Sequence, residues 1–223
     1  MIRLQHVSKV FGAGPAKVPA LSDISFSIEK GALVVLTGAS GAGKTTLLRM
    51  LYRDETPSEG EIEVAGFNVT GLGRSEIPRL RRAIGIVFQD SKLLAGRTVF
   101  ENVAFVLRVL GTPRHDITPR AFAALKAVGL SARAQAYPHQ LSQGEAQRAS
   151  LARAIVKAPA LLLADEPTGN LDEEMAGEIL DLVKDFWSRG TTVILATHQA
   201  RLVAQLKRRT LRLERGRLVK DEG

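Results

Sequence analysis

The fold of this chain follows from one run of residues, Gly38-Ala39-Ser40-Gly41-Ala42-Gly43-Lys44-Thr45. An apolar run, 33–37, precedes it, and a helix-forming run, 46–52, follows it. The order is strand, glycine-rich turn and helix, with the G-x-x-x-x-G-K-S/T spacing of a phosphate-binding loop. Glycines let backbone N–H groups turn toward phosphate oxygens, and the N-terminus of a helix attracts anions. The run therefore predicts a site for a nucleoside triphosphate.

Two side chains at the end of this loop have predicted roles. Lys44 can neutralise the β- and γ-phosphates as a point charge, and the hydroxyl of Thr45 can bind Mg²⁺. The alternative is an ordinary turn with a surface lysine. The flanking strand and helix favour the phosphate site, because the motif carries its meaning only in that context.

Length and composition indicate a soluble globular protein. The chain has 223 residues, of which 45% are hydrophobic and 24% charged, enough for one large α/β domain with or without a small subdomain. No apolar run reaches the roughly 18–20 residues that span a bilayer. The chain has no cysteine, which excludes disulfides and thiolate metal sites, and it begins directly with a strand pattern instead of a signal peptide. We expect a cytoplasmic protein.

The net charge of +8 is unevenly distributed. Between Arg201 and Lys220 there are eight basic residues and one acidic residue, Glu214. Such a basic edge suits nucleic acid or the anionic inner leaflet of a membrane. It equally suits a solvated surface that keeps the protein soluble, and charge alone does not decide between these interpretations.

The first part of the chain is predicted to form antiparallel strands. Residues 2–7 and 24–28 alternate apolar and polar side chains, as half-buried strands do, and residues 61–64 continue as a strand. Gly12-Ala13-Gly14-Pro15 predicts a turn or loop between the first two. These strands surround the buried strand that leads into the phosphate loop.

The middle of the chain is predicted to be helical. Apolar residues recur at helical spacing over 98–130, and Gly111-Thr112-Pro113 separates two helices there. A further helix is expected over 145–157. We therefore predict a single domain, 1–223, in which a helical subdomain of about 91–157 is inserted into an α/β core formed by 1–90 and 158–223.

The last part alternates strands and helices. Apolar strands are predicted at 84–88, 161–164 and 192–196, and helices at 75–83 and 173–187. Continuous apolar strands that alternate with helices indicate a parallel sheet covered on both faces.

Polar side chains follow three of these apolar strands. Asp165 and Glu166 follow the second, where one carboxylate can hold Mg²⁺ and the other can orient or deprotonate a water. Gln89 follows the first and His198 the third, within reach of a metal, a water or a γ-phosphate. Singly, each has an ordinary structural explanation. Together, at the carboxyl ends of strands beside a phosphate loop, they predict a catalytic site.

Leu141-Ser142-Gln143-Gly144-Glu145 begins another helix. The Ser142 hydroxyl, the bare backbone at Gly144 and the helix N-terminus could form a second anion site. The alternative is a simple capping box, with Ser142 as the N-cap and Glu145 closing the box. The spacing alone favours the capping box.

Taken in order, these motifs resemble those of an ATP-binding-cassette ATPase, and they cover nearly the whole chain. The corresponding Walker A, Q-loop, signature, Walker B, D-loop and H-loop motifs are Gly38–Thr45, Gln89, Leu141–Glu145 with Gln147-Arg148, Leu161–Glu166, Gly169–Asp172 and His198.

The resemblance implies a P-loop NTPase (RecA-like) α/β core with an N-terminal antiparallel β subdomain and an inserted α-helical subdomain. It also implies Mg²⁺-dependent ATP hydrolysis by a head-to-tail homodimer with two ATP molecules at its interface. Glu166 would be the catalytic base, His198 would sense the γ-phosphate, and Thr45, Gln89 and Asp165 would serve Mg²⁺. The ATP-binding residues implied in one subunit are Phe11, Gly38, Ser40, Gly41, Gly43, Lys44, Thr45, Thr46 and Asp172, with Ser142 and Gly144 of the other subunit.

Two residues depart from the family pattern. The signature usually carries glycine where this chain has Gln143, which bears on the backbone of the second anion site. Phe11 stands where the family usually has a tyrosine that stacks on adenine, so the stack is kept and the hydroxyl is lost.

Within the family, the chain resembles the branch that acts in bacterial cell division. The resemblance rests on Phe88-Gln89-Asp90 with Leu93-Leu94 and on the runs 97–104 and 164–172. That branch implies an integral membrane permease-like partner and a peripheral location on the cytoplasmic face of the inner membrane, with no nucleic acid. One alternative is the ATPase of a lipoprotein-releasing or macrolide-type exporter, and another is a soluble nucleic-acid-associated ATPase. We expect coupling to the partner through the groove near 89–100, where Leu93 and Leu94 are predicted to lie on an exposed loop.

Overall fold

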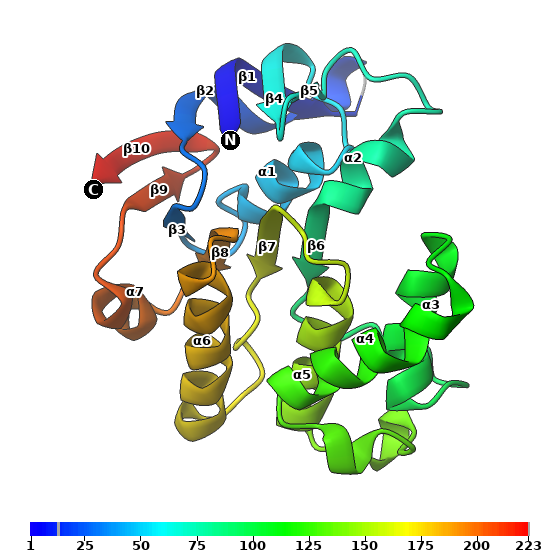
Figure 1. Cartoon of the computed structure of the whole chain (residues 1–223). Helices are drawn as coiled ribbons and strands as arrows, with labels where there is room; N and C mark the ends of the chain where they lie inside the picture. Colours follow the sequence, from blue (N-terminus) through cyan, green and yellow to red (C-terminus); the bar gives the residue numbers. More distant parts are fainter. Residues whose placement is uncertain (13, 223) are drawn as a thin grey trace.

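The computed structural model describes residues 1–12 and 14–222, and two sheets organise them (Figure 1). One is a four-stranded antiparallel sheet in the order β2-β1-β4-β5, and the other is a six-stranded sheet in the order β10-β9-β3-β8-β7-β6. The elements are β1 Ile2–Phe11, η1 Gly14–Ala16, β2 Val18–Ile28, β3 Leu33–Thr37, α1 Lys44–Leu51, β4 Glu59–Val64, β5 Phe67–Asn68, α2 Ile77–Ala83, β6 Ile84–Val87, α3 Val99–Val109, α4 Arg114–Ala127, η2 Ser131–Arg133, η3 Pro138–Gln140, α5 Gln143–Ile155, β7 Leu161–Asp165, α6 Glu173–Ser188, β8 Thr192–Thr197, α7 Ala200–Leu206, β9 Thr210–Glu214 and β10 Arg217–Glu222.

The antiparallel sheet forms where the sequence alternates. Ile2, Leu4 and Val7 are buried, and the intervening polar residues are exposed. The first strand is longer than the predicted 2–7, because β1 passes a register shift near His6, whose φ is 49°, and continues to Phe11. Of the turn predicted at 12–15, Ala13 lies outside the described residues.

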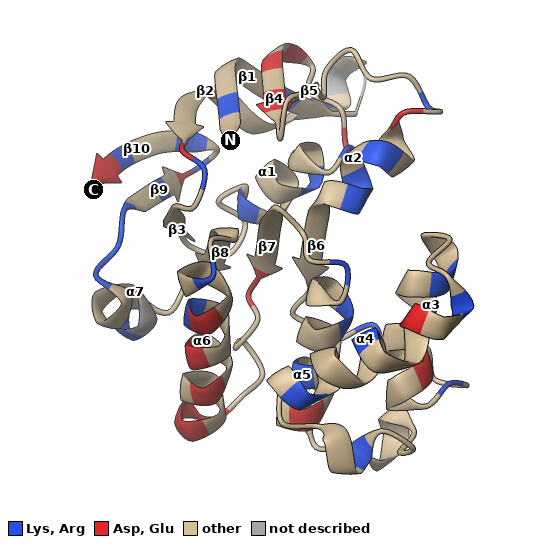
Figure 2. Cartoon of the chain, viewed as in Figure 1, with Lys and Arg blue, Asp and Glu red and all other residues tan. Residues whose placement is uncertain are grey.

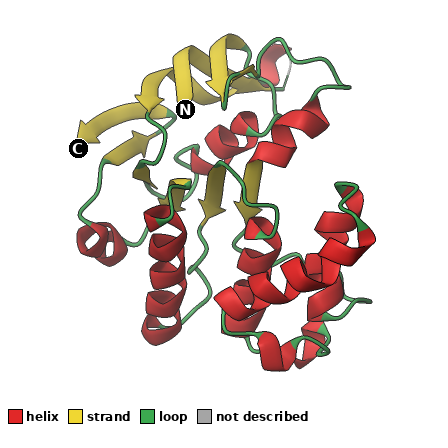
Figure 3. Ribbon diagram, viewed as in Figure 1, coloured by secondary structure: helices red, strands yellow, loops and turns green. Residues whose placement is uncertain are grey.

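The six-stranded sheet is buried on both faces. In β3, Leu33 and Val35 pack into one hydrophobic cluster, whereas Val34 and Leu36 pack into another, because successive side chains of a strand point to opposite faces. Helices α3 to α6 contribute to the first cluster, and α1 with the antiparallel sheet contributes to the second. Figure 3 shows this arrangement, with α1 between the two sheets and the helices of the middle segment gathered at one end. The predicted α/β fold class is confirmed.

The parallel core has the expected strands. The parallel neighbours are, in order, β3, β8, β7 and β6. Leu195 of β8, for example, lies between Val35 of β3 and Ala164 of β7. Consequently the carboxyl ends of these four strands meet at one edge of the sheet. Gln89, Asp165 and His198 lie at the ends of β6, β7 and β8, and the phosphate loop follows β3.

The basic C-terminal stretch belongs to this sheet, which the sequence interpretation did not predict. β9 pairs in parallel with β3, and β10 returns antiparallel beside β9. Several of its cations are paired with carboxylates. The ion pairs are Arg201–Glu173 at 3.5 Å, Arg209–Asp221 at 2.7 Å, Arg212–Glu214 at 2.7 Å and Lys220–Glu222 at 2.6 Å.

Charge is unevenly distributed among the helices. Figure 2 shows acidic residues along α6 and basic residues along α2. Among residues 1–12 and 14–222, no helix combines the length and the apolar character needed to cross a membrane.

Candidate nucleotide-binding and catalytic site

The phosphate loop is packed tightly on its inner side. Gly43 has a φ of 105°, and a Cβ atom there would lie 2.7 Å from Leu21 Cδ2 and 2.9 Å from the carbonyl oxygen of Ala20. A Cβ atom on Gly38 would lie 2.4 Å from the carbonyl oxygen of Leu213. Only glycine fits at these two positions, so β2 and β9 hold the loop in one conformation.

The loop directs a cation and a helix N-terminus toward the same point. Helix α1 begins at Lys44, and no side chain among the described residues caps its N-terminus. The Lys44 ammonium is 6% exposed and donates to the carbonyl oxygens of Gly38, at 2.8 Å, and Ala39, at 3.2 Å. Uncapped N–H groups beside an ammonium form an anion site.

Glu166 lies at the centre of the predicted catalytic site. Its carboxylate is buried, with Oε1 2.9 Å from Nδ1 of His198 and 3.3 Å from Nζ of Lys44. Its backbone N–H donates to the carbonyl oxygen of Ala196 at 2.9 Å, and its φ is 49°. A non-glycine residue held at positive φ is strained, and such strain concentrates at functional sites. The surrounding strands therefore fix this carboxylate beside the phosphate loop.

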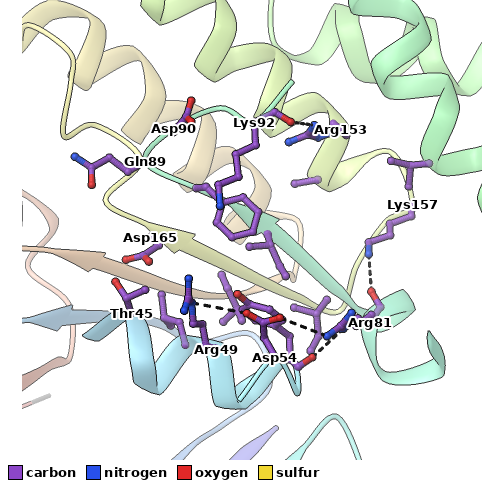
Figure 4. A pocket seen from close by; sticks show the side chains of 18 of the residues that line it. Thr45, Arg49, Asp54, Arg81, Gln89, Asp90, Lys92, Arg153, Lys157 and Asp165 are labelled. Atoms are coloured by element: carbon purple, nitrogen blue, oxygen red, sulfur yellow. Dashed lines mark hydrogen bonds and ion pairs between the residues drawn. The ribbon is translucent and has the colours of Figure 1, made fainter. Parts of the chain in front are cut away.

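Asp165 fits a divalent cation. Burial raises the pKa of its carboxyl group, while the adjacent Thr45 hydroxyl acts in the opposite direction. Its Oδ1 atom is buried and has no hydrogen-bond partner among the described residues. A partly buried carboxylate with a free oxygen beside a hydroxyl is an incomplete oxygen-ligand set of the kind that Mg²⁺ completes. Figure 4 shows Thr45 and Asp165 pointing toward one another.

Gln89 lies near Thr45 and Glu166, in the same cleft. Its Nε2 atom is 3.4 Å from Oδ1 of Asn170, a long contact, and the side chain packs over Gly169, where a Cβ atom would be only 3.0 Å from Nε2. One weak hydrogen bond therefore holds the amide near Thr45 and Asp165, and the amide can reorient.

Most of the predicted site residues share one cleft of about 310 Å³, but Phe11, Gly38 and Asp165 do not line it. The structure brings Gln89, Glu166 and His198 together with the loop, although they are far apart in the sequence. The residues that line the cleft are Ala20, Ser40, Gly41, Gly43, Lys44, Thr45, Thr46, Gln89, Glu166 and His198.

Ser142, Gly144 and Asp172 are not among these lining residues. Ser142 and Glu145 form the capping box at the start of α5, with N–H to oxygen distances of 3.1 and 2.9 Å. Asp172 similarly caps α6 by accepting from the N–H of Met175 at 2.9 Å. A Cβ atom on Gly144 would lie 2.7 Å from Sδ of Met175, so these two helix starts are packed together. Within one chain Ser142 and Asp172 are exposed away from the cleft, whereas Gly144 is buried against Met175.

A second cavity, of about 780 Å³, lies between α1, β6 and α5. We call it the basic groove. Asp54, Asp90 and Asp165 are its acidic lining residues, and the rest of its wall is largely apolar. The basic lining residues are Arg49, Arg81, Lys92, Arg153 and Lys157. These cations were not predicted as a group, because they are scattered over more than a hundred residues of sequence.

The cations of the basic groove have two kinds of polar partner (Figure 4). Arg49 and Arg81 lie 3.7 and 3.8 Å from the carboxylate of Asp54, and the others are bound to backbone carbonyl groups or lie over an aromatic ring. Arg153 donates to the carbonyl oxygens of Lys92 and Ser91 at 2.6 and 2.7 Å, and Lys157 donates to that of Arg81 at 2.6 Å. Burial lowers the pKa of Arg153, and it lowers the pKa of Lys157 to about 8. The groove therefore favours an anionic occupant.

Replacing Lys157 with methionine is expected to remove a pH dependence of stability. Burial lowers the Lys157 pKa from 10.5 to about 8, so between these values the unfolded chain binds more protons than the folded chain. The free energy of unfolding of the wild type then rises as pH increases across this window, by at most about 3 kcal/mol. Urea unfolding at pH about 7.5 and about 9.5 measures the rise.

The control for this experiment is Lys184→Met, which removes an exposed lysine paired with Asp181. This variant should keep the wild-type rise. Equal pH dependence in wild type and Lys157→Met would contradict the assignment.

Comparison with known proteins agrees with this geometry. The model of the ABC transporter family matches residues 21–169. The chain is 46% identical to "Cell division ATP-binding protein FtsE" of Mycobacterium tuberculosis over 222 residues, covering all of this chain and 96% of that protein. It is 47% identical to the protein of the same name from Escherichia coli K12, covering 98% of this chain and 97% of that one.

Solved structures show the same fold. A structure described as a dimeric post-hydrolysis state of the ATP-binding cassette MJ0796 bound to ADP and Pi superposes with a TM-score of 0.90 at 33% identity, covering all of this chain and 98% of that one. The cbiO1 protein of Clostridium perfringens, part of the ABC transporter complex cbiONQ, has a TM-score of 0.89 at 29% identity, covering 99% of this chain and 87% of that one.

The family resemblance expected from the sequence motifs is therefore confirmed. Matches over the whole chain also favour the cell-division branch among the alternatives. The chain belongs to the ABC transporter family of ATP-binding, ATP-hydrolysing proteins and, within that family, to the FtsE group.

Proposed function

We propose that this protein is the ATPase subunit of an FtsEX-like membrane complex in bacterial cell division. ATP-driven dimerisation would change the conformation of an FtsX-like membrane partner, which in turn activates peptidoglycan hydrolysis. The names of the FtsE relatives support a role in cell division. The observation that carries the enzymatic part is the buried Glu166 carboxylate, held beside the phosphate loop by contacts to Lys44 and His198.

In this proposal Glu166 accepts a proton from the attacking water, and His198 orients Glu166 through their 2.9 Å contact and senses the γ-phosphate. Lys44 exchanges its bonds to Gly38 and Ala39 for bonds to the β- and γ-phosphates of ATP. The other loop residues proposed to bind the phosphates are Gly38, Ser40, Gly41, Gly43, Thr45 and Thr46, and Phe11 is proposed to stack on adenine.

Mg²⁺ is proposed to be held by Thr45, Asp165 and Gln89. The free, buried Oδ1 atom of Asp165 supports a cation there. A bound Mg²⁺ would supply charge neutralisation at the phosphate oxygens. Gln89 reaches toward both this position and the basic groove, so its weakly held amide is suited to report nucleotide state.

A second copy of the chain is proposed to complete each ATP site. Ser142 and Gly144 of that copy would contact the γ-phosphate, with Asp172 nearby. The exposed outer face of the loop at Ser40 and Gly41 and the match to a dimeric cassette bound to ADP and Pi support this arrangement. Gln143 is exposed on the first turn of α5 and would lie in the same interface.

The block of about 91–157 is proposed to act as a helical subdomain that moves with the partner. Helices α3, α4 and α5 pack on one another, although α5 also packs on β6 and α6, and residues 88–98 link β6 to α3. Asn102, which is fully buried, ties this link to α3 by accepting from the N–H of Leu94 at 2.7 Å and donating to its carbonyl oxygen at 3.2 Å.

The membrane partner is proposed to dock in the basic groove on the cytoplasmic face of the inner membrane. Apolar walls and unbalanced positive charge support a helical segment with acidic side chains as its occupant, and nucleic acid is not expected. Neither Leu93 nor Leu94 lines the groove itself, but both follow its lining residue Lys92. Leu94 is 38% exposed, as predicted, whereas Leu93 is half-buried and packs against the core, so Leu94 is the better contact beside the groove.

The test of this function is co-purification from detergent-solubilised membranes followed by an ATPase assay. Recovery of an FtsX-like protein that changes ATP turnover supports the proposal. Recovery of a lipoprotein-releasing permease without an FtsX-like protein would overturn the cell-division role and leave the ATPase assignment intact.

Replacing Leu94 with glutamate is expected to weaken the complex with the membrane partner at least tenfold, because the change buries a carboxylate in an apolar contact. ATP affinity should stay unchanged, since Leu94 does not line the nucleotide cleft. Pulldown and nucleotide titration on the same preparations measure the two quantities.

The matched control is Val109→Glu, which makes the same apolar-to-acidic change at a 64% exposed residue at the end of α3. It should leave the complex intact. Parallel loss of partner and ATP binding in Leu94→Glu would contradict the docking assignment.

A further inference from the structure

Lys9 is a buried cation beside the proposed adenine contact. It is 8% exposed, and lysine is rarely buried unless it is paired. Its Nζ atom lies 2.9 Å from Oε2 of Glu55, donates to the carbonyl oxygen of Thr56 at 2.9 Å, and lies 4.7 Å from the centre of the Phe11 ring. The ammonium therefore has a fixed place under one aromatic ring.

The strand pairing places this ring at the nucleotide side of the molecule. Lys9 is opposite Leu21, and Phe11 is opposite Val18. Leu21 packs where a side chain on Gly43 would otherwise be, so the β1–β2 pair borders the phosphate loop. Phe11 is 38% exposed although it is apolar, which leaves part of its ring open to a ligand.

Lys9 also joins this ring to the phosphate end of the site. Glu55 and Thr56 belong to the loop that follows α1, the helix that begins at Lys44. Ser58 in the same loop accepts from the N–H of Val10 at 3.0 Å. The last residues of β1 are thus fastened to the element that carries the phosphate loop.

We propose that Lys9 is a positioning residue for adenine, acting through Phe11. The ammonium holds the ring from one face by a cation–π contact and draws electron density from it, so that the opposite face stacks better on the electron-rich purine. The inference rests on the proposed function, in which Phe11 contacts adenine. It assigns to Lys9 a share of the affinity for the base and none for the phosphates.

The test compares ligands with and without the base on the full-length protein. In Lys9→Met, the dissociation constants of ATP and ADP should rise roughly three- to tenfold, because a cation–π contact of ordinary strength is lost. The dissociation constant of inorganic tripolyphosphate should not change. Lys9→Arg, which keeps a cation, should restore most of the affinity for ATP.

Glu55→Gln is the matched control for the ion pair. It removes the carboxylate partner of Lys9 but keeps the ammonium at the Thr56 carbonyl group, so the melting temperature should fall while ATP affinity is retained. A loss of ATP affinity in Glu55→Gln equal to that in Lys9→Met would show that the ion pair, and not the ring contact, matters, and would overturn the inference.

Phe11→Ala separates this inference from the function it rests on. If Phe11→Ala does not weaken ATP binding, Phe11 is not the adenine contact and both assignments fail. If Phe11→Ala weakens ATP binding but Lys9→Met does not, only the role of Lys9 fails. In the Phe11→Ala background, Lys9→Met should have no further effect on ATP, whereas an undiminished effect would identify a general structural role and overturn the inference.

Discussion

Replacing Glu166 with glutamine is expected to lower ATP turnover by about 10²- to 10⁴-fold, the usual contribution of a general base. The amide cannot accept a proton from water. It has the same shape, however, and its oxygen can still accept from Nδ1 of His198, where the carboxylate now lies at 2.9 Å. The expected product is a protein that binds ATP and accumulates as an ATP-bound dimer. Steady-state turnover and size-exclusion chromatography with ATP measure both effects.

Because Glu166 is buried, the expected loss of turnover can be assigned to this carboxylate alone. The carboxylate is 8% exposed, so its replacement cannot be compensated by a neighbouring surface acid. Asp181→Asn, an acid-to-amide change in an exposed ion pair with Lys184, is the control and should turn over ATP normally. Normal turnover in Glu166→Gln would refute the assignment of the base.

The sequence was sufficient for the parts of the site that depend on local chemistry. The phosphate loop is contiguous, and its glycine positions follow from backbone geometry at Gly38 and Gly43. Gln89, Asp165 and His198 were predicted from a topological rule, because the ends of neighbouring parallel strands meet. The strand order itself required the structure, since periodicity does not say which strands are neighbours.

The sequence interpretation did not predict β9 and β10, because it considered only the positive charge of the C-terminal stretch and not its alternation of apolar and polar residues. The signal was present, since Leu211 and Leu213 alternate with polar residues and Gly216 supplies the turn with a φ of 78°. Both leucines are buried in the second core cluster. Arg212 lies between them on the exposed side of β9, and Arg217 and Lys220 are exposed on the edge strand β10, which accounts for much of the apparent basic tail.

The basic groove and the Lys9–Phe11 contact were beyond sequence reasoning for a different reason. Lys157 and Arg81 meet through a hydrogen bond to a backbone carbonyl, and no residue pattern encodes such a contact. Lys9 looks like an ordinary polar position in an alternating strand until the loop at Glu55 is seen to cover it. Both depend on tertiary packing.

Replacing Lys44 with methionine is expected to weaken ATP binding roughly 10- to 100-fold, the equivalent of losing charge-assisted hydrogen bonds to the phosphates. The ammonium is 6% exposed and its bonds to Gly38 and Ala39 keep it inside the loop, so no other cation can take its place without moving the backbone. The loss should be greater for ATP than for ADP, because the proposed contacts include the γ-phosphate. Isothermal titration with both nucleotides measures the difference.

Lys44→Arg distinguishes charge from shape in this prediction. It keeps the positive charge, but the planar guanidinium needs more room than an ammonium that is almost fully buried. We therefore expect Lys44→Arg to bind ATP poorly as well, whereas the exposed control Lys30→Met should bind it normally. ATP affinity within about threefold of the wild type in Lys44→Met would contradict the assignment. In that case the backbone N–H groups and the N-terminus of α1 would be sufficient for the triphosphate, and the bonds of Lys44 to Gly38 and Ala39 would be structural.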